Sequence, residues 1–408
     1  MNPADTAWML MSAALVLLMT PALAFFYGGL VRAKNVLNTM MMSFISLGFV
    51  GVLWAVAGYS LAFGPGNAWV GDLSRLFLNG VGLEAQGTIP HVLFMAYQGT
   101  FAIITAALIS GAIVERMRFS AYLLFICAWV VVVYSPVAHW VWGGGWLAGL
   151  GALDFAGGTV VHVNAAVAAL VAAVVVGPRQ EYPSSSLLPH SVPFTLLGAG
   201  LLWFGWFGFN AGSALSAGPV AGLAFVTTML APAATLVVWT FIDIVRTGKP
   251  TAVGCATAIV VGLVAVTPAA GFVSPMSAIV LGGIAAVPSY FALIIRARSG
   301  FDDSLDVVAA HGLGGTVGAL LTGVFADREL NGVADGLLFG NPRQLGIQAA
   351  AVLAAIVYSG VASFVLLKVI GLVVPLRVSS RGETEGLDIH QHGEEAYLHA
   401  EGRSQASV

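Results

Sequence analysis

Long apolar stretches separated by short polar segments dominate the hydrophobic pattern of this 408-residue chain. A bilayer core about 30 Å thick needs roughly 20 apolar residues of helix. Eleven stretches approach or exceed this length, at residues 8–29, 39–62, 90–113, 119–138, 158–177, 193–210, 219–243, 251–267, 276–296, 307–325 and 345–373. The pattern therefore predicts an all-α polytopic membrane protein with eleven transmembrane helices.

The chain divides into two regions of different composition. Residues 1–375 form the predicted transmembrane domain, and residues 376–408 form a polar, mildly acidic tail. Two interpretations of the tail remain open. It is either a passive solvated segment or a docking segment that contacts loop residues such as Arg116, Arg118 and Arg179. Exposed ion pairs of this kind contribute only about 0–1 kcal/mol each, so a docked tail would be movable and suited to regulation.

Lysine and arginine residues gather on one side of the predicted membrane. They follow the odd-numbered stretches, beginning with Arg32 and Lys34, and 13 of the 16 lie on that side. Arg75, Arg328 and Arg343 fall on the other side. Because loops rich in Lys and Arg remain in the cytoplasm, the pattern predicts an outside N-terminus and a cytoplasmic C-terminus.

Composition agrees with a membrane protein. Hydrophobic residues make up 58% of the chain and charged residues only 9%, against about 25% charged in a soluble domain. The net charge of −3 gives no basic footprint for nucleic acid. The 50 glycines allow helix backbones to approach closely in a bundle. Cys127 and Cys255 lie in apolar stretches, where we expect buried small side chains and no disulfide framework.

Two histidines lie inside predicted spans, where polar residues are candidates for function. His162 is in the fifth span and His311 in the tenth. Spans 1–5 and 6–10 can be two halves of an internal repeat, followed by one additional C-terminal helix. Because each half has an odd number of spans, the second half crosses the membrane in the opposite direction to the first. Two adjacent imidazoles could satisfy each other by a hydrogen bond. The alternative, two separate core histidines bonded to backbone, remains equally open. A metal site is disfavoured because no Cys, Asp or Glu lies nearby in sequence.

An acid and a group of aromatic residues accompany these histidines. Asp154 precedes His162 by eight residues, about 12 Å along a helix, and a helix-capping role is favoured over direct substrate contact. Aromatic residues crowd the outer halves of several spans, and most fit an ordinary interfacial belt. Aromatic faces also bind cations, and a hydroxyl such as that of Ser213 could accept an N–H of a small ammonium ion.

Several segments together identify a family resemblance. They occur in one order along nearly the whole chain and read FYGGLVRAKN, QGTFA, GAIVERMRFSA, HWVWGGGWLA, DFAGGTVVHVNAA, WFGFNAGSA and DVVAAHGLGGTVG. They resemble the signature segments of the ammonium transporter (Amt/Mep/Rh) family. The tail segment GLDIHQHGEEAY is similar to the cytoplasmic end of its bacterial Amt-like members. One departure is Tyr97, which stands where some bacterial members carry Phe.

The resemblance implies a set of functional residues. These are an outer recruitment site of Phe101, Trp142 and Ser213, a gate of Phe101 and Phe209, pore residues His162, His311 and Trp206, a conduction-linked acid Asp154, and a pore-near Thr267. It also implies a homotrimer in the cell (inner) membrane, ammonium and methylammonium as substrates, and a PII-type signalling protein as a cytoplasmic partner.

The expected function is ammonium transport rather than catalysis. An apolar pore imposes a heavy desolvation cost on any ion, and neutral ammonia avoids that cost whereas potassium has no neutral form. We therefore expect ammonium to be recruited outside, deprotonated, and passed along the twin histidines. The alternative is an ammonium sensor with little net transport. An enzyme is disfavoured because no nucleophile, metal set or cofactor fingerprint is present, and no cofactor is expected.

Overall fold

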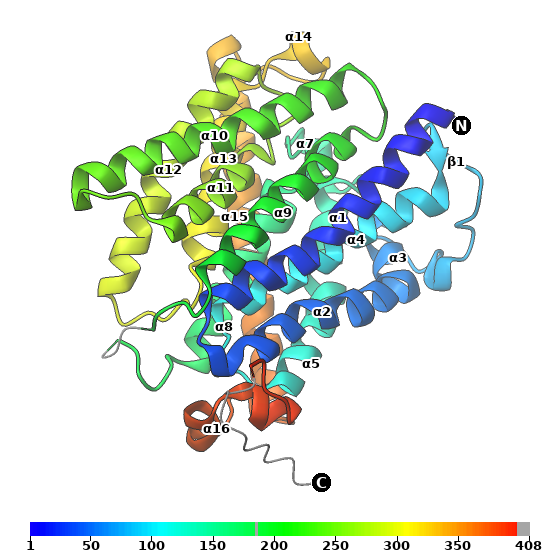
Figure 1. Ribbon diagram of the computed structural model, residues 1–408. Coiled ribbons are helices and arrows are strands. Elements are labelled where there is room, and N and C mark those ends of the chain that lie inside the picture. Colours follow the sequence, from blue (N-terminus) through cyan, green and yellow to red (C-terminus); the bar gives the residue numbers. More distant parts are fainter. Residues whose placement is uncertain (184–186, 398–408) are drawn as a thin grey trace.

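The computed structural model describes residues 1–183 and 187–397, and this part of the chain is almost wholly helical (Figure 1). The long helices of the first half are α1 (Pro3–Leu30), α2 (Val36–Leu53), α4 (His91–Ile109), α5 (Phe119–Trp129) and α8 (Asn164–Val176). Those that follow are α9 (Val192–Ala211), α10 (Pro219–Thr247), α11 (Ala252–Val266), α12 (Pro275–Arg298), α13 (Gly314–Phe325) and α15 (Pro342–Gly371). Each predicted span falls on one of these helices.

Shorter elements complete the described chain. The short helices are α3 (Tyr59–Phe63), α6 (Ser135–Val141), α7 (Trp146–Leu150), α14 (Arg328–Asn331) and α16 (Ser380–Glu385). Strands β1 (Ala85–Gln86) and β2 (Ile89–Pro90) form a small antiparallel pair in the long loop before α4. Proline stands in the first turn of α1, α9, α10, α12 and α15, where its missing N–H costs nothing.

Four spans contain a π-helical turn that the hydrophobic pattern does not reveal. Trp54–Gly58 joins α2 to α3, and Val130–Tyr134 joins α5 to α6. Gly158–Val163 opens α8, and Val308–Leu313 opens α13. Ten helical segments of the described chain are long and apolar enough to cross a membrane, and α11 is a shorter apolar helix of 15 residues. The protein is thus multi-pass, while length alone supports ten of the eleven predicted crossings.

Close packing of α1 against α9 depends on glycine. The two helices run side by side through the bundle (Figure 1). A Cβ atom on Gly208 would lie 2.8 Å from the carbonyl oxygen of Ser12, and one on Gly205 would lie 2.8 Å from that of Leu15. Both distances are too short for a real Cβ contact, so larger side chains would push the helices apart. Small residues at such an interface are typical of membrane bundles.

The N-terminus and residues 376–397 lie at opposite ends of the bundle (Figure 1). We call the end that carries residues 376–397 the tail face and the other end the opposite face. The tail packs against the loop between α4 and α5. The N–H of Arg118 donates to the carbonyl of Leu376 at 2.8 Å, and the N–H of Val378 donates to that of Arg116 at 3.0 Å. The described part of the tail is therefore docked, and residues 398–408 lie outside the described chain.

The docking contacts differ from the predicted ion pairs. The carboxylate of Asp388 accepts the N–H groups of Leu37 at 3.0 Å and Asn38 at 2.8 Å, so it caps the first turn of α2. Glu383 pairs with Arg377, which belongs to the tail itself. The tail thus docks against the loop of Arg116 and Arg118, as one of the two interpretations expected, but through backbone hydrogen bonds. Among the described residues, no ion pair joins a tail carboxylate to Arg116, Arg118 or Arg179.

Two of those three arginines have carboxylate partners elsewhere. Arg179 pairs with Glu115 and Asp302, and Arg116 lies 3.9 Å from Asp302. Burial explains the difference, because a buried guanidinium needs fixed partners within the membrane domain.

Candidate functional site

A cavity of about 290 Å³ opens toward the opposite face of the bundle. Its described lining residues are uncharged and comprise Phe63, Phe94, Gln98, Phe101, Val141, Trp142, Phe155, Ser213 and Leu215. The structure therefore brings together the three residues predicted for recruitment. They come from α4, from the residue after α6, and from the turn after α9.

Hydrogen bonds orient two of these residues. The indole Nε1 of Trp142 donates to the carbonyl of Asp154 at 2.9 Å, which fixes the ring at the cavity wall. The hydroxyl of Ser213 donates to the carbonyl of Phe209 at 2.8 Å. The Tyr97 hydroxyl lies 3.2 Å from that of Ser213 and 2.9 Å from the carbonyl of Gly208. The hydroxyl hydrogen of Ser213 is thus already used in a hydrogen bond, and its oxygen can still accept one.

Two phenylalanine rings close the floor of this cavity. Phe101 and Phe209 stack with ring centroids 4.1 Å apart and an interplanar angle of 22°. Both side chains are buried, and Trp142 meets Phe101 edge-on at 6.0 Å. The two rings that were predicted to form a gate are therefore in direct contact.

The two histidines lie beyond these rings, in a constricted apolar segment. The Nδ1 atoms of His162 and His311 are 3.2 Å apart, and the ring centroids are 5.2 Å apart. The space beside them is only about 10 Å³, close to the minimum that holds one water molecule. Because both rings use Nδ1, one donates and the other accepts, and Nε2 of His162 is left without a hydrogen-bond partner among the described residues.

Trp206 and Thr267 hold the first histidine in place. The indole ring of Trp206 stacks on His162 at 5.5 Å and 23°. Its Nε1 donates to the hydroxyl of Thr267 at 2.9 Å, and that hydroxyl donates to the carbonyl of Leu263 at 2.8 Å. Thr267 therefore acts on the pore through Trp206.

Asp154 occupies the capping position predicted for it. Its carboxylate accepts four backbone N–H groups at the start of the fifth span, those of Gly157 (2.8 Å), Gly158 (2.6 Å), Thr159 (2.8 Å) and Val160 (3.1 Å). Its own carbonyl accepts from Trp142. Asp154 thus joins the outer cavity to the histidine helix without lining the cavity itself.

Asp303 holds the corresponding position in the second half, and the sequence reasoning missed it. It precedes His311 by eight residues, as Asp154 precedes His162. Its Oδ2 accepts the N–H of Val308 at 2.7 Å. The identical Asp-to-His spacing in the two halves was the signal that could have revealed it. The shared spacing and the π-helical turn that opens both helices support an internal repeat.

A second cavity, of about 410 Å³, opens toward the tail face and reaches His311. Its wall combines apolar residues such as Tyr27 and Val260 with polar ones such as Arg296 and Asp306. Two cavities at opposite faces are thus separated by the phenylalanine pair and the histidines.

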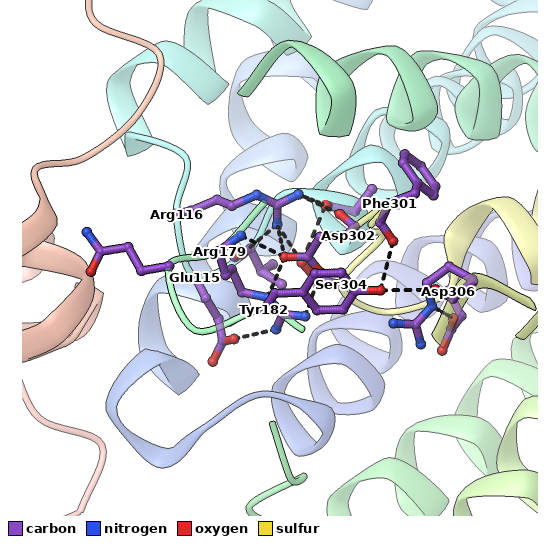
Figure 2. Close-up of polar contacts among 12 residues, drawn as sticks. Glu115, Arg116, Arg179, Tyr182, Phe301, Asp302, Ser304 and Asp306 are labelled. Carbon is purple, nitrogen blue, oxygen red and sulfur yellow. Dashed lines mark hydrogen bonds and ion pairs between the residues drawn. The ribbon is translucent and has the colours of Figure 1, made fainter. Parts of the chain in front are cut away.

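Figure 2 shows the polar cluster beside this second cavity. Arg179 forms a bond of 2.6 Å to Glu115 and bonds of 2.7 and 2.9 Å to Asp302. The Nη1 of Arg116 donates to the hydroxyl of Ser304 at 2.6 Å. The cluster joins the loop after α4, the loop after α8 and the loop after α12, and so fixes the walls of the cavity.

In this cluster, the combined effect of the arginine charges and hydrogen bonds on the carboxylate pKa values is larger than the effect of burial. Burial acts to raise the pKa of Glu115, but the charges of Arg179 and Arg32 lower it below its ordinary value. The pKa of Asp302 is lowered in the same way, since the hydrogen bond from Arg179 and the charge of Arg116 exceed the effect of burial. Both carboxylates are therefore ionised at neutral pH.

Comparison with known proteins agrees with this geometry. The model of the Ammonium Transporter Family matches residues 7–397. An ammonium transporter of Bacillus subtilis is 48% identical over 402 residues, covering 97% of this chain and 99% of the relative. One from Aquifex aeolicus is 50% identical, with 97% and 94% covered.

Solved structures give the same result. Mep2 of Saccharomyces cerevisiae superposes with a TM-score of 0.86 at 35% identity, covering 93% of this chain and 88% of that one. A structure described as a sensor Amt protein gives 0.89 at 31%, with 95% and 98% covered. By sequence over nearly its full length and by fold, the chain belongs to the ammonium transporter family.

Proposed function

We propose that this protein transports ammonium across the cell (inner) membrane for nitrogen uptake, and that the substrate crosses the narrow segment as ammonia. The observation that carries the proposal is the hydrogen-bonded histidine pair in an apolar constriction between two vestibules. An apolar passage of this width excludes hydrated ions, because removing a cation from water there costs several kcal/mol.

Recruitment begins in the uncharged cavity at the opposite face. The rings of Phe101 and Trp142 offer π-faces to a cation, each contributing about 0.5–2 kcal/mol. The oxygen of Ser213 supplies an acceptor for one N–H. Potassium has the same charge but no directed donor, so the hydroxyl favours ammonium, and methylammonium keeps enough N–H groups to compete.

Passage requires loss of a proton and movement of the gate. The stacked rings of Phe101 and Phe209 leave no space for a hydrated ion. Ammonia that passes them meets the two imidazoles, whose hydrogen-bonding nitrogens replace part of its lost hydration. Trp206 and Thr267 keep His162 oriented for this contact.

The proposed orientation places the tail face in the cytoplasm. The excess of Lys and Arg on that side supports it. We further propose a homotrimer with one pore per subunit, and a PII-type signalling protein that binds at the tail face. The docked conformation of residues 376–397 supports a regulatory role for the tail.

Currents recorded on a solid-supported membrane test the proposal. Proteoliposomes should give saturable currents or uptake with ammonium and methylammonium and none with potassium. His311→Ala removes one ring of the pair and should lower the ammonium-to-potassium ratio by at least tenfold. His190→Gln changes a histidine outside the pore and should behave as the wild type.

The competing function is an ammonium sensor with little net transport, which the contact between the gate rings favours. The same recordings separate the two. Saturable ammonium binding with currents no larger than those of protein-free liposomes would establish the sensor and end the transport proposal.

A further inference from the structure

The segments that lead into the two histidine helices share the same Asp-to-His spacing, and both have a residue of positive φ five positions before the histidine. Five residues before His162 stands Gly157, with a φ of 114°. Five residues before His311 stands Asp306, with a φ of 61°. Glycine adopts positive φ without steric cost, whereas an L-residue with a Cβ pays roughly 1–2 kcal/mol. Aspartate is among the few L-residues that adopt this conformation, so the second half keeps the backbone geometry of Gly157 and adds a carboxyl group at that position.

Asp306 faces the path that leads away from the histidines. It lines the 410 Å³ cavity together with His311. Its side chain is 20% exposed, and its Oδ1 accepts from Nε of Arg296 at 2.8 Å. The carboxyl group is therefore accessible from the cavity and held at its wall by one hydrogen bond.

A second acid beside it has unused hydrogen-bonding capacity. Oδ1 of Asp303 is buried without a hydrogen-bond partner among the described residues. Asp154, its counterpart in the first half, accepts four N–H groups. The inner end of the repeat thus contains two carboxyl groups near the pore, one of them incompletely hydrogen bonded, whereas the single acid at the outer end is fully hydrogen bonded.

Burial and the surrounding charges together place the pKa of Asp306 close to neutral pH. The charged groups around it are Arg296 on α12, Arg179 in the loop after α8, and Asp303 in its own loop. Burial raises the pKa of Asp306 to about 7; Arg296 and Arg179 act against this rise, and Asp303 adds to it. The group therefore holds a proton part of the time at neutral pH.

We propose that Asp306 is the carboxyl group that protonates ammonia at the cytoplasmic mouth of the pore, an inference that rests on the proposed transport function. The O–H bond of protonated Asp306 breaks as a fourth N–H bond forms on ammonia, which leaves a carboxylate and an ammonium ion. Water in the open cavity then returns a proton from the cytoplasm to the carboxylate. The adjacent positive charge of Arg296 offsets attraction between the carboxylate and the new cation, which favours release.

The dependence of conduction on pH tests this role. The ratio of wild-type to Asp306→Asn current at saturating ammonium should fall about tenfold from pH 6 to pH 8, because the protonated fraction of a group with this pKa falls by that factor. Using the ratio removes the effect of pH on the substrate. Asp306→Glu should restore the dependence. A constant ratio across this range overturns the proposal.

Glu181→Gln is the matched control. Glu181 also pairs with an arginine, Arg32, at 2.6 Å on the tail face, but it does not line the cavity. Its current should follow the wild type at every pH. If Glu181→Gln reproduces the profile of Asp306→Asn, loss of any tail-face carboxylate suffices and the assignment is wrong.

A measurement on the unmodified protein covers the case in which Asp306→Asn does not fold. Infrared difference spectra should contain a protonated carboxyl band that titrates near pH 7 and loses intensity when ammonium is added. Absence of that band in the wild type overturns the proposal. Failure of transport itself is recognised separately, because the wild type would then give no ammonium current at any pH.

Discussion

At the scale of single residues, the outer cavity leads to a prediction about Trp142. Trp142→Leu keeps an apolar side chain but removes the π-face and the bond to the Asp154 carbonyl. Loss of about 0.5–2 kcal/mol of cation binding raises the ammonium concentration for half-maximal current roughly 2- to 30-fold. Solid-supported-membrane recordings over a concentration series measure this shift.

Trp146→Leu serves as the control for that variant. Trp146 lies nearby on α7 and does not line the cavity, so its half-saturation should equal that of the wild type. An unchanged half-saturation in Trp142→Leu, with normal folding, would remove Trp142 from the recruitment site.

The sequence predicted most of the residues that the structure brings together around the outer cavity and the histidine pair, and the residues it missed were missed for a physical reason. The histidines were found because polar residues are rare within apolar spans, and the outer aromatic residues through a family resemblance. Asp303 and Asp306 were missed because they lie in a polar loop, where carboxylates are common and usually solvated. Asp303 is distinguished by its burial and Asp306 by its positive φ, and only the folded chain reveals these features.

At the scale of elements, Asp388 links the tail to α2. Its carboxylate caps two N–H groups of that helix, and loss of such a cap costs about 0.5–2 kcal/mol. Asp388→Asn should therefore raise amide hydrogen exchange in residues 376–397 several-fold while leaving α1 and α9 unaffected. Mass spectrometry of exchanged peptides measures this.

Glu385→Gln is a suitable comparison, because the ion pair that the described chain gives Glu385 is with Arg381, on the exposed side of α16. Its exchange pattern should remain that of the wild type. If amide exchange in Asp388→Asn equals that of the wild type, the cap does not hold the tail in place.

The helices were predicted well, but their internal breaks were not. Apolar runs identify a span by length and hydropathy alone. A π-helical turn such as Gly158–Val163 adds a residue to one turn and changes no residue type, so it leaves no mark in the pattern. For the tail, the loop that it docks against was expected, but the type of contact was not, because a backbone hydrogen bond such as that between Arg118 and Leu376 depends on no particular side chain.

At the scale of the whole molecule, the polar cluster predicts acid sensitivity. Glu115 and Asp302 have lowered pKa values in the folded protein, so their stabilising effect is present above the unfolded pKa of about 4 and is lost as pH falls through the lower folded values. The unfolding temperature should therefore decrease when the pH is lowered below about 4.

Asp302→Asn leaves Arg179 incompletely paired and should destabilise the protein by about 3–5 kcal/mol while flattening this acid dependence. Glu181→Gln breaks a more exposed pair and should cost no more than about 1 kcal/mol. Calorimetry in detergent at several pH values provides the measurement. A destabilisation below 1 kcal/mol in Asp302→Asn would show that the cluster contributes little.

The tail face also leads to a prediction about partners. Removing residues 378–408 takes away Asp388 and the segment around it, and should alter conduction or abolish binding of a PII-type protein in a pull-down. The Glu385→Gln protein keeps the tail in place and should bind as the wild type. Normal conduction together with unchanged binding by the truncated protein would make the tail passive.

The contact between the two Nδ1 atoms imposes an order on any proton that crosses the histidine pair. The single hydrogen between them fixes opposite tautomers in the two rings. A proton that arrived at Nε2 of His162 and departed from Nε2 of His311 would shift that hydrogen and reverse both tautomers. The pair could not repeat the hop until the tautomers were reset. Under the proposed transport function, a proton relay through this pair would therefore need a reset step after each event, and that step would limit how often charge follows ammonia.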